Sequence, residues 1–300
     1  MTFVATITSR RTIWMVADRR LTVGDRPVTD NAVKIFALNT SDGTALIGYA
    51  GLGRTINGMQ PSEWMSNVLR GRNWPMNTSM KAIADAMTRE VPRHLARARG
   101  ACEHVIVAPA FVNNRPRLYG TGLKVDSRGI PTSAFHVLLV RDATTAWPHR
   151  MTFSGSGSKK VKHNEKHRAL LRLANAYDAG KIFPTAVADK LAELSFNVSR
   201  EDKFTGPKSI VAWRSINKGS MKGGSGGHHF YDGLTRETDT PALPSIGHGL
   251  DVAALANAIW QYHTPRSVAA LEGKPALPND PYELRRLTEG LPSGPDEELR

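Results

Sequence analysis

The pattern of apolar and polar positions predicts strands at the start of the chain. Residues 2–8 and 12–17 are rich in apolar and β-branched residues and are separated by a short polar link, which predicts a β-hairpin. Two further short apolar runs, at 34–38 and 44–50, predict a third and a fourth strand. Because some runs are apolar at consecutive positions, we expect these strands to be covered on both faces.

After these strands the apolar residues recur at helical spacing, and a second set of strands and helices follows. Helices are expected at 61–71, 78–91, 158–176 and 184–198, with Pro92 ending or kinking the second; strands are expected at 104–111, 134–140, 147–153 and 208–216. Runs of strands and runs of helices, without strict alternation, predict the α+β class. Two antiparallel sheets packed face to face with helices outside, a four-layer αββα sandwich, would cover strands that are apolar on both faces.

The composition of the chain changes near residue 217. We expect one domain at 1–217, followed by a Gly/Pro-rich extension at 218–300 with a glycine-rich linker near 219–227. A short helix is expected at 250–262, with Asp251 as its N-cap. The last 36 residues hold six of the 18 prolines, which predicts a disordered tail.

Charge and cysteine content limit the class of protein. The formal net charge is +13, which is typical of a protein that binds nucleic acid or of one with a basic solvent face. Cys102 is the only cysteine, so no disulfide within the chain and no CxxC motif is possible, and a cytoplasmic location fits. No apolar run approaches the ~20 residues of a membrane span, so no membrane partner is expected. The sequence indicates no cofactor.

Candidate chemistry begins at Thr2. The residue after Met1 is small, the kind of start from which the initiator methionine is removed, and removal would leave Thr2 as a free N-terminal threonine. Its hydroxyl would be a nucleophile and its own α-amine a base, because an α-amine titrates near ~8. In hairpin-connected strands, Asp18 and Lys34 can both return to Thr2, and a glycine such as Gly48 can offer its N–H to an oxyanion.

Four segments in register resemble the β-subunits of the proteasome and the peptidase subunit of its bacterial ATP-dependent relative, in the N-terminal nucleophile hydrolase superfamily. They are the Thr2 start, VADRRLT at 16–22, NAVKIFAL at 31–38 and ALIGYAG at 45–51. The resemblance covers about residues 2–216. It implies a threonine endopeptidase with a proteasome-like fold, in a closed homo-oligomeric ring that an ATPase unfoldase can feed.

The resemblance also implies roles for individual residues. Thr2 would be nucleophile and base, with Asp18 and Lys34 in support and Gly48 as oxyanion donor. Four residues would serve substrate binding: Arg20 as a structural residue of its turn, Thr22 and Ala50 along an extended substrate bound by strand addition, and Leu46 in the main specificity pocket. Ser156, Asp202 and Thr205 would complete the catalytic set, although Glu201 and Pro207 depart from the family's motif around Asp202.

Several alternatives stay open on the sequence alone. The chain can be a proteasome-like subunit without activity that serves assembly, or an enzyme acting on a small amide. A basic nucleic-acid-binding protein is a further alternative, but no interleaved aromatic residues support it, and nucleic acid is not expected as a partner. His228, His229 and Asp232 are too few ligands for a convincing metal site, and SGSGS at 154–158 lacks the full P-loop pattern.

Overall fold

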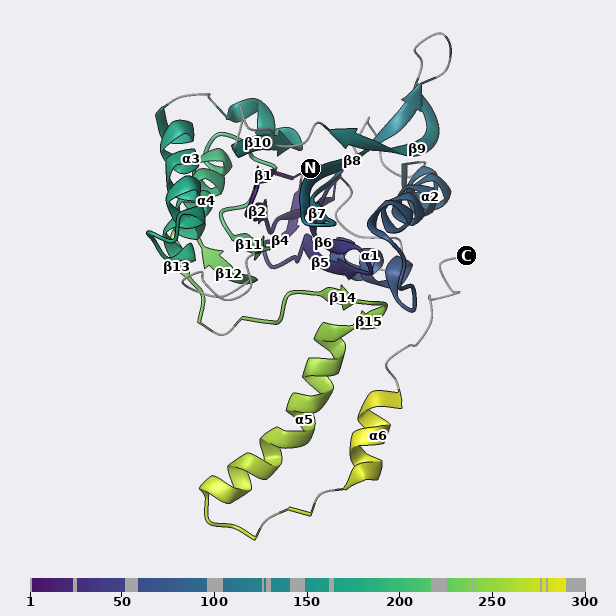
Figure 1. The fold of residues 1–300 in the computed structure, drawn as a ribbon, viewed down its shortest axis with the longest axis vertical. Coiled ribbons are helices and arrows are strands. Elements are labelled where there is room, and N and C mark those ends of the chain that lie inside the picture. Colours follow the sequence, from purple (N-terminus) through teal and green to yellow (C-terminus); the bar gives the residue numbers. More distant parts are fainter. Residues whose placement is uncertain are drawn as a thin grey trace.

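The computed structural model contains both helices and antiparallel sheets, which confirms the α+β class (Figure 1). It describes residues 2–23, 26–51, 59–95, 105–125, 127, 131–140, 149–161, 165–216, 226–238, 240–275, 277–278 and 280–289.

The first sheet is built on the N-terminal hairpin. Its strands run in the order β10 (His149–Ser154), β1 (Val4–Ser9), β2 (Thr12–Asp18), β11 (Ser209–Ser215), β12 (Gly226–Asp232) and β13 (Thr235–Arg236). All neighbours are antiparallel. The predicted hairpin is confirmed, with Val4 opposite Ala17.

The second sheet has the order β15 (Leu250–Asp251), β14 (Ser245–Gly247), β5 (Ile35–Thr40), β6 (Gly43–Ala50), β7 (Val105–Val112), β8 (Arg115–Val125) and β9 (Pro131–Val140). Its pairs are antiparallel except the parallel contact of β14 with β5. A separate two-stranded ribbon is formed by β3 (Leu21–Val23) and β4 (Arg26–Thr29).

Three apolar clusters hold the layers together. One joins the two sheets and includes Met15 of β2, Ile210 of β11 and Leu46 of β6. A second packs the helices α1 (Pro61–Leu69) and α2 (Met76–Leu95) on the second sheet. A third packs α3 (Glu165–Asp178) and α4 (Pro184–Ser199) on the first sheet. The consecutive apolar positions of β1 and β2 follow from this arrangement, because both faces of these strands are buried.

Several elements differ from the sequence prediction. Helix α2 continues past Pro92 to Leu95, so Pro92 does not end it. Burial of Met80, Ile83 and Met87 against the second sheet outweighs the one hydrogen bond that the proline cannot donate. Strand β8 was not predicted, because its glycines and basic residues hide the strand pattern. A short 3₁₀ helix at Ser156–Lys160 precedes α3, which therefore begins later than expected.

The C-terminal region contains more structure than its composition predicts. Strands β12 and β13 belong to the first sheet, and β14 and β15 belong to the second. The expected short helix is longer than predicted, α5 (Val252–Leu271), and is followed by α6 (Pro281–Glu289). Asp251 caps α5 as predicted, accepting a hydrogen bond from the Ala254 N–H at 2.9 Å. Most of the predicted linker, and residues 290–300 of the predicted tail, lie outside the described residues. The division after residue 217 stays a prediction. Among the described helices, none has the length and apolar character needed to cross a membrane.

Candidate active site

The structure brings Thr2, Lys34 and Asp18 together where the two sheets meet. Lys34 Nζ donates to Thr2 Oγ1 at 2.7 Å and to Asp18 Oδ2 at 3.0 Å. Asp18 is the last residue of β2, and its N–H donates to the Phe3 carbonyl, so the hairpin fixes it beside the start of the chain. Lys34 directly precedes β5 of the second sheet, so the packing of one sheet on the other brings it to the first. The predicted trio is therefore assembled by the fold itself.

Asp18 is held by donors on both carboxylate oxygens. Oδ1 accepts the Phe3 N–H at 2.7 Å. Oδ2 accepts the Arg20 N–H at 2.9 Å and the Gly206 N–H at 3.2 Å, in addition to Lys34. The carboxylate is fully buried, so these donors replace the water that it has lost. Its position and orientation are consequently fixed from three segments of the chain.

The buried position of Lys34 changes its proton affinity. Burial lowers the pKa of the Lys34 ammonium below its ordinary value, and the nearby Asp18 carboxylate opposes this shift in part. A larger fraction of the amine is therefore neutral near neutral pH than for an exposed lysine. A neutral amine 2.7 Å from the Thr2 hydroxyl can accept its proton.

Gly48 and Ala50 lie in the middle of the second sheet. Gly48 is opposite Ile35 of β5 and opposite Val107 of β7, and Ala50 is opposite Val105. Gly48 is thus paired on both sides, whereas Ala50 is paired with β7 and lies beyond the last residue of β6 that pairs with β5. The binding of an extended substrate along residues 48–50 stays a prediction. The assignment of Gly48 as oxyanion donor stays a prediction.

Leu46 is fully buried in the cluster between the sheets. It cannot contact a substrate side chain unless its neighbours move, so its place in a specificity pocket also stays a prediction. Thr22 lies in β3, next to β4.

Arg20 bonds to Asp30 and to the loop that carries Thr205, and its role in substrate binding stays a prediction. Its Nε and Nη2 bind the two oxygens of Asp30 at 2.7 and 3.0 Å, and its Nη1 donates to the carbonyls of Lys203 and Thr205. The bidentate pair raises the pKa of the Arg20 guanidinium, which keeps its charge. Arg20 therefore ties the segment after Asp18 to the loop that carries Thr205.

Ser156, Asp202 and Thr205 form a second hydrogen-bonded group. Asp202 Oδ2 accepts from Ser156 Oγ at 2.9 Å and from Thr205 Oγ1 at 2.8 Å. The departures at Glu201 and Pro207 do not prevent this arrangement. Their catalytic role stays a prediction.

Two neighbouring glycines connect this group to the start of the chain. A Cβ on Gly155 would come within 1.9 Å of the Thr2 carbonyl oxygen, and one on Gly157 within 2.8 Å of Thr205 Oγ1. The group therefore lies next to the Thr2 and Phe3 backbone. Gly155, with a φ of +84°, and Gly206, whose N–H supports Asp18, are the residues that the sequence analysis missed. The glycine spacing around Ser156 was a usable signal for the first, whereas nothing near Gly206 indicated its role.

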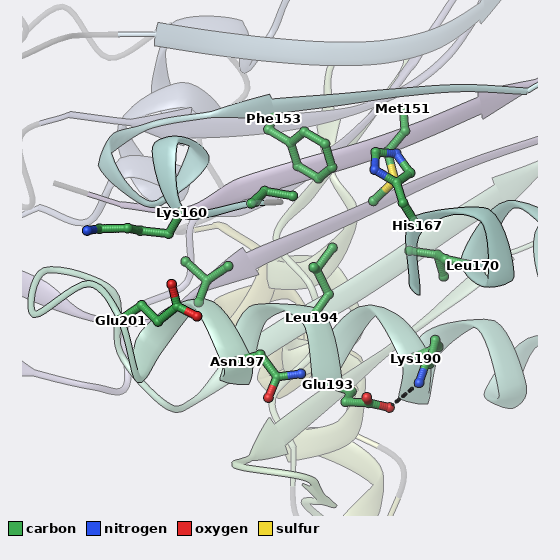
Figure 2. Close-up of a pocket in the computed structure, with 12 residues that line it drawn as sticks. Met151, Phe153, Lys160, His167, Leu170, Lys190, Glu193, Leu194, Asn197 and Glu201 are labelled. Atoms are coloured by element: carbon green, nitrogen blue, oxygen red, sulfur yellow. Dashed lines mark hydrogen bonds and ion pairs between the residues drawn. The ribbon is translucent and has the colours of Figure 1, made fainter. Parts of the chain in front are cut away.

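Thr2 is only 3% exposed. A cavity of about 110 Å³ between β10, α3 and α4 has Phe153, Leu170 and Leu194 among its apolar lining residues, and does not include Thr2, Asp18 or Lys34 (Figure 2). This cavity is therefore separate from the candidate chemistry.

His228 and His229, for which the sequence shows too few partner ligands for a convincing metal site, face opposite sides of their strand. His228 packs against Phe230, whereas the adjacent His229 packs against Trp213 and Tyr231, as expected for neighbours on a strand that face opposite sides. Within the described part of the chain, no group of three or more His, Cys, Asp or Glu residues could hold a metal ion.

Comparison with known proteins gives distant similarities only. No family model and no curated protein matches the chain. Among solved structures, "Anbu (ancestral beta-subunit) from Yersinia bercovieri" is 12% identical, with a TM-score of 0.42, covering 93% of this chain and 100% of that one. An Anbu (Gly-1) mutant from Hyphomicrobium sp. strain MC1 is 14% identical (TM-score 0.41, 80% of this chain, 86% of that one), and Anbu from the same strain is 11% identical (TM-score 0.41, 75% and 86%).

These findings correct the resemblance drawn from the sequence. The assignment to the proteasome β-subunit and bacterial peptidase-subunit family is wrong as stated, because no family model matches and the structures found are Anbu proteins at low TM-score. Short motifs at the right spacing did not make the chain a member of that family. At this level of similarity the comparisons carry no argument about activity, which has to come from the site.

Proposed function

We propose that the protein is a threonine-type hydrolase that cleaves amide bonds, with peptide bonds as its substrates and Thr2 as its nucleophile. The observation that carries the proposal is the buried hydrogen-bonded chain from Asp18 through Lys34 to Thr2 Oγ1. The three apolar clusters support, as part of the same proposal, a four-layer αββα sandwich.

The chemistry follows from the contacts. Thr2 Oγ1 attacks the carbonyl carbon while its proton passes to a base, either Lys34 Nζ or the α-amine freed by removal of Met1. Asp18 orients Lys34 and balances the positive charge that forms on it. The leaving amine departs with a proton, an ester on Thr2 remains, and water hydrolyses it. Assembly into a homo-oligomer belongs to the proposal, whereas the described residues give no support for an ATPase partner.

The test is covalent labelling of the full-length protein. An electrophile directed at N-terminal threonine is added, and the adduct is mapped by peptide mass spectrometry. We expect the adduct on Thr2 in the wild-type protein and in Thr2→Ser, and none in Thr2→Val, which keeps the shape of the side chain without its hydroxyl. Lys34→Met should slow labelling strongly. Equal labelling of Thr2→Val would overturn the proposal, and an intact mass that retains Met1 in every molecule would exclude the α-amine as base.

A specific observation favours a second candidate, the hydrolysis of a small amide. Both edges of β6 are paired near Gly48, and Thr2 is buried, so an extended peptide has less room than a small molecule. A panel of fluorogenic peptides and small amides, assayed with wild type and Thr2→Val, separates the two. Turnover of peptides that is lost in Thr2→Val supports the first candidate, and turnover confined to small amides supports the second.

A further inference from the structure

The space between the two sheets ends in a polar cleft at the end opposite Thr2. In β11, Ser209 lies opposite Asp18 and Arg214 lies opposite Ile13, so Arg214 is ~17 Å along the strand from the candidate active site. The cleft measures about 610 Å³ and is lined by the ends of β5, β6, β7 and β11 and by the turn between β14 and β15. It is therefore separate from the Thr2 site.

Arg214 occupies a strand position at which its neighbours are apolar. Side chains alternate between the two faces of a strand, and Ile210 and Ala212, on the same face as Arg214, both lie in the apolar cluster between the sheets. Arg214 therefore faces the space between the sheets, at its open end. The next strand makes room for it, because a Cβ on Gly226, opposite Arg214, would lie 2.9 Å from Arg214 Cδ and Nη1. The fold thus places a cation at the end of an apolar row.

Among the described residues, this cation has no carboxylate partner. Arg214 Nη1 donates to the Trp213 carbonyl at 2.9 Å, which leaves most of the five guanidinium N–H donors for other acceptors. Burial alone lowers the pKa of the Arg214 guanidinium below its ordinary value. Asp42 also lines the cleft, but its Oδ1 accepts from Thr40 Oγ1 and from the Met76 N–H at the start of α2, each at 2.8 Å. The charge of Arg214 is therefore available to an anion from outside.

The second sheet supplies neutral hydrogen-bonding groups to the same cleft. Asn39 of β5 lies opposite Thr44 of β6, and Thr44 Oγ1 donates to Asn39 Oδ1 at 2.7 Å, so the amide nitrogen of Asn39 remains a donor. Asn113 in the β7–β8 turn and His248 in the β14–β15 turn add further polar side chains to the lining. Most of the lining side chains are polar, so the cleft suits a hydrophilic ligand. Phe111, which also lines it, is only 1% exposed and is too buried to stack on a nucleobase.

We propose that this cleft binds a small phosphorylated polyol or sugar, with its phosphate group on Arg214 and its hydroxyl groups near Asn39 and Asn113. A phosphate monoester presents three terminal oxygens where a carboxylate presents two, which suits a guanidinium joined by neutral donors from a second sheet. The cleft volume lies within the ~300–1,000 Å³ range of small-molecule sites, and a bare phosphate ion would fill little of it. Binding here does not depend on Thr2 chemistry, so either proposal can fail without the other.

Isothermal titration calorimetry of the full chain, in a buffer without phosphate or sulfate, tests the ligand class. Glycerol 3-phosphate is the probe, and inorganic phosphate and glycerate are the comparisons. We expect one site per chain for glycerol 3-phosphate, with weaker binding of inorganic phosphate, which lacks the hydroxyl groups, and of glycerate, which carries a carboxylate instead. Inorganic phosphate that binds as tightly as the probe would indicate an adventitious ion only. That result, equal binding of glycerate, or no binding of the probe at millimolar concentration would each overturn the proposal.

Three variants, each checked for folding by circular dichroism, assign the binding to the cleft. Arg214→Met should raise the dissociation constant of the probe at least about tenfold, because hydrogen bonds to a charged group are lost. Asn113→Gly should raise it about threefold, since glycine keeps the turn, in which Asn113 has a φ of +48°, and removes only the amide. Arg236→Met is the matched control, because Arg236 lies in β13 of the same sheet and pairs with Asp189 outside the cleft.

The pattern across the variants decides the outcome. The exposed turn position of Asn113 keeps the test in force even if Arg214→Met does not fold. A loss in Arg236→Met equal to that in Arg214→Met would show attraction to the net positive charge alone. That result, or wild-type affinity in Arg214→Met or in Asn113→Gly, would overturn the proposal.

Discussion

Substitution of Asp18 should lower the free energy of unfolding more than substitution of its partner Lys34, although the two form one ion pair. Replacing Asp18 with Asn keeps the shape of the side chain but removes the charge and one acceptor. Three donors converge on Asp18 Oδ2, from Lys34, Arg20 and Gly206. An amide nitrogen in that place faces donors only, and a buried ammonium is left without its counter-ion. Breaking a buried pair in this way costs about 3–5 kcal/mol of unfolding free energy.

Replacing Lys34 with Met leaves the Asp18 carboxylate buried but still hydrogen-bonded. Methionine has a similar unbranched stem, and the Asp18 carboxylate keeps three backbone donors, from Phe3, Arg20 and Gly206. We therefore expect a loss of only about 1–3 kcal/mol, the range for removing one partner of a buried hydrogen bond. The double variant should lose less than the sum of the two single variants, because the uncompensated ammonium is gone.

Urea unfolding followed by tryptophan fluorescence measures these differences at one fixed protein concentration. Trp14 is fully buried beside Tyr177 and Trp213, so its emission should report loss of the core. The comparison holds if the dependence of free energy on urea is the same for all variants. A Lys34→Met variant at least as unstable as Asp18→Asn would refute the reasoning, since it would mean that the backbone donors do not hold the carboxylate.

Three further changes test other parts of the site. Gly155→Ala should lower the free energy of unfolding by more than about 2 kcal/mol, because the residue has a φ of +84° and its new Cβ would overlap the Thr2 carbonyl. Gly180→Ala is the control in the same urea assay: its φ is +71° but the space around it is open, so only about 1 kcal/mol should be lost to backbone strain. The free energy of unfolding of the wild type, relative to that of Lys34→Met, should rise with pH between the lowered pKa of Lys34 and its ordinary value of 10.5. In that window the unfolded state binds a proton on Lys34 that the folded state has lost. Urea midpoints measured over a range of pH give this slope. Arg20→Gln should lower the free energy of unfolding by about 1 kcal/mol, because its bidentate pair with Asp30 is only partly exposed. Arg285→Gln, which breaks an exposed pair with Glu289, should leave the thermal midpoint unchanged.

The sequence predicts the N-terminal part of the site well because the information there is local. The hairpin follows from two apolar runs and a short link, and pairing of its strands returns Asp18 to the start of the chain. Lys34 needs one more step, the packing of β5 against the first sheet. That step is also visible, since consecutive apolar positions require cover on both faces.

Other contacts depend on segments far apart in the chain, which no local pattern reports. The N–H of Gly206 reaches Asp18 across 188 positions, and a glycine gives no sign of what its backbone will meet. Strands β8 and β12 are rich in glycine, histidine or basic residues, and they become strands because a neighbouring strand offers a partner, not because of their own propensity. The family resemblance failed for the opposite reason: short motifs in register describe a local constellation and do not fix the family of a 300-residue chain.

The candidate site also depends on residues that the sequence placed outside it. Arg19, next to Asp18, is buried, and it binds Glu237 at 2.8 Å while lying over the Phe230 ring at 4.9 Å. On the other sheet, β14 pairs with β5, the strand that begins directly after Lys34. The segment from β12 to β14 therefore supports the neighbours of both charged residues from two sides. Because a buried ion pair tolerates little displacement, the geometry around Thr2 depends on the segment from β12 to β14 as well as on the N-terminal strands, and substitutions near Glu237 should alter the site.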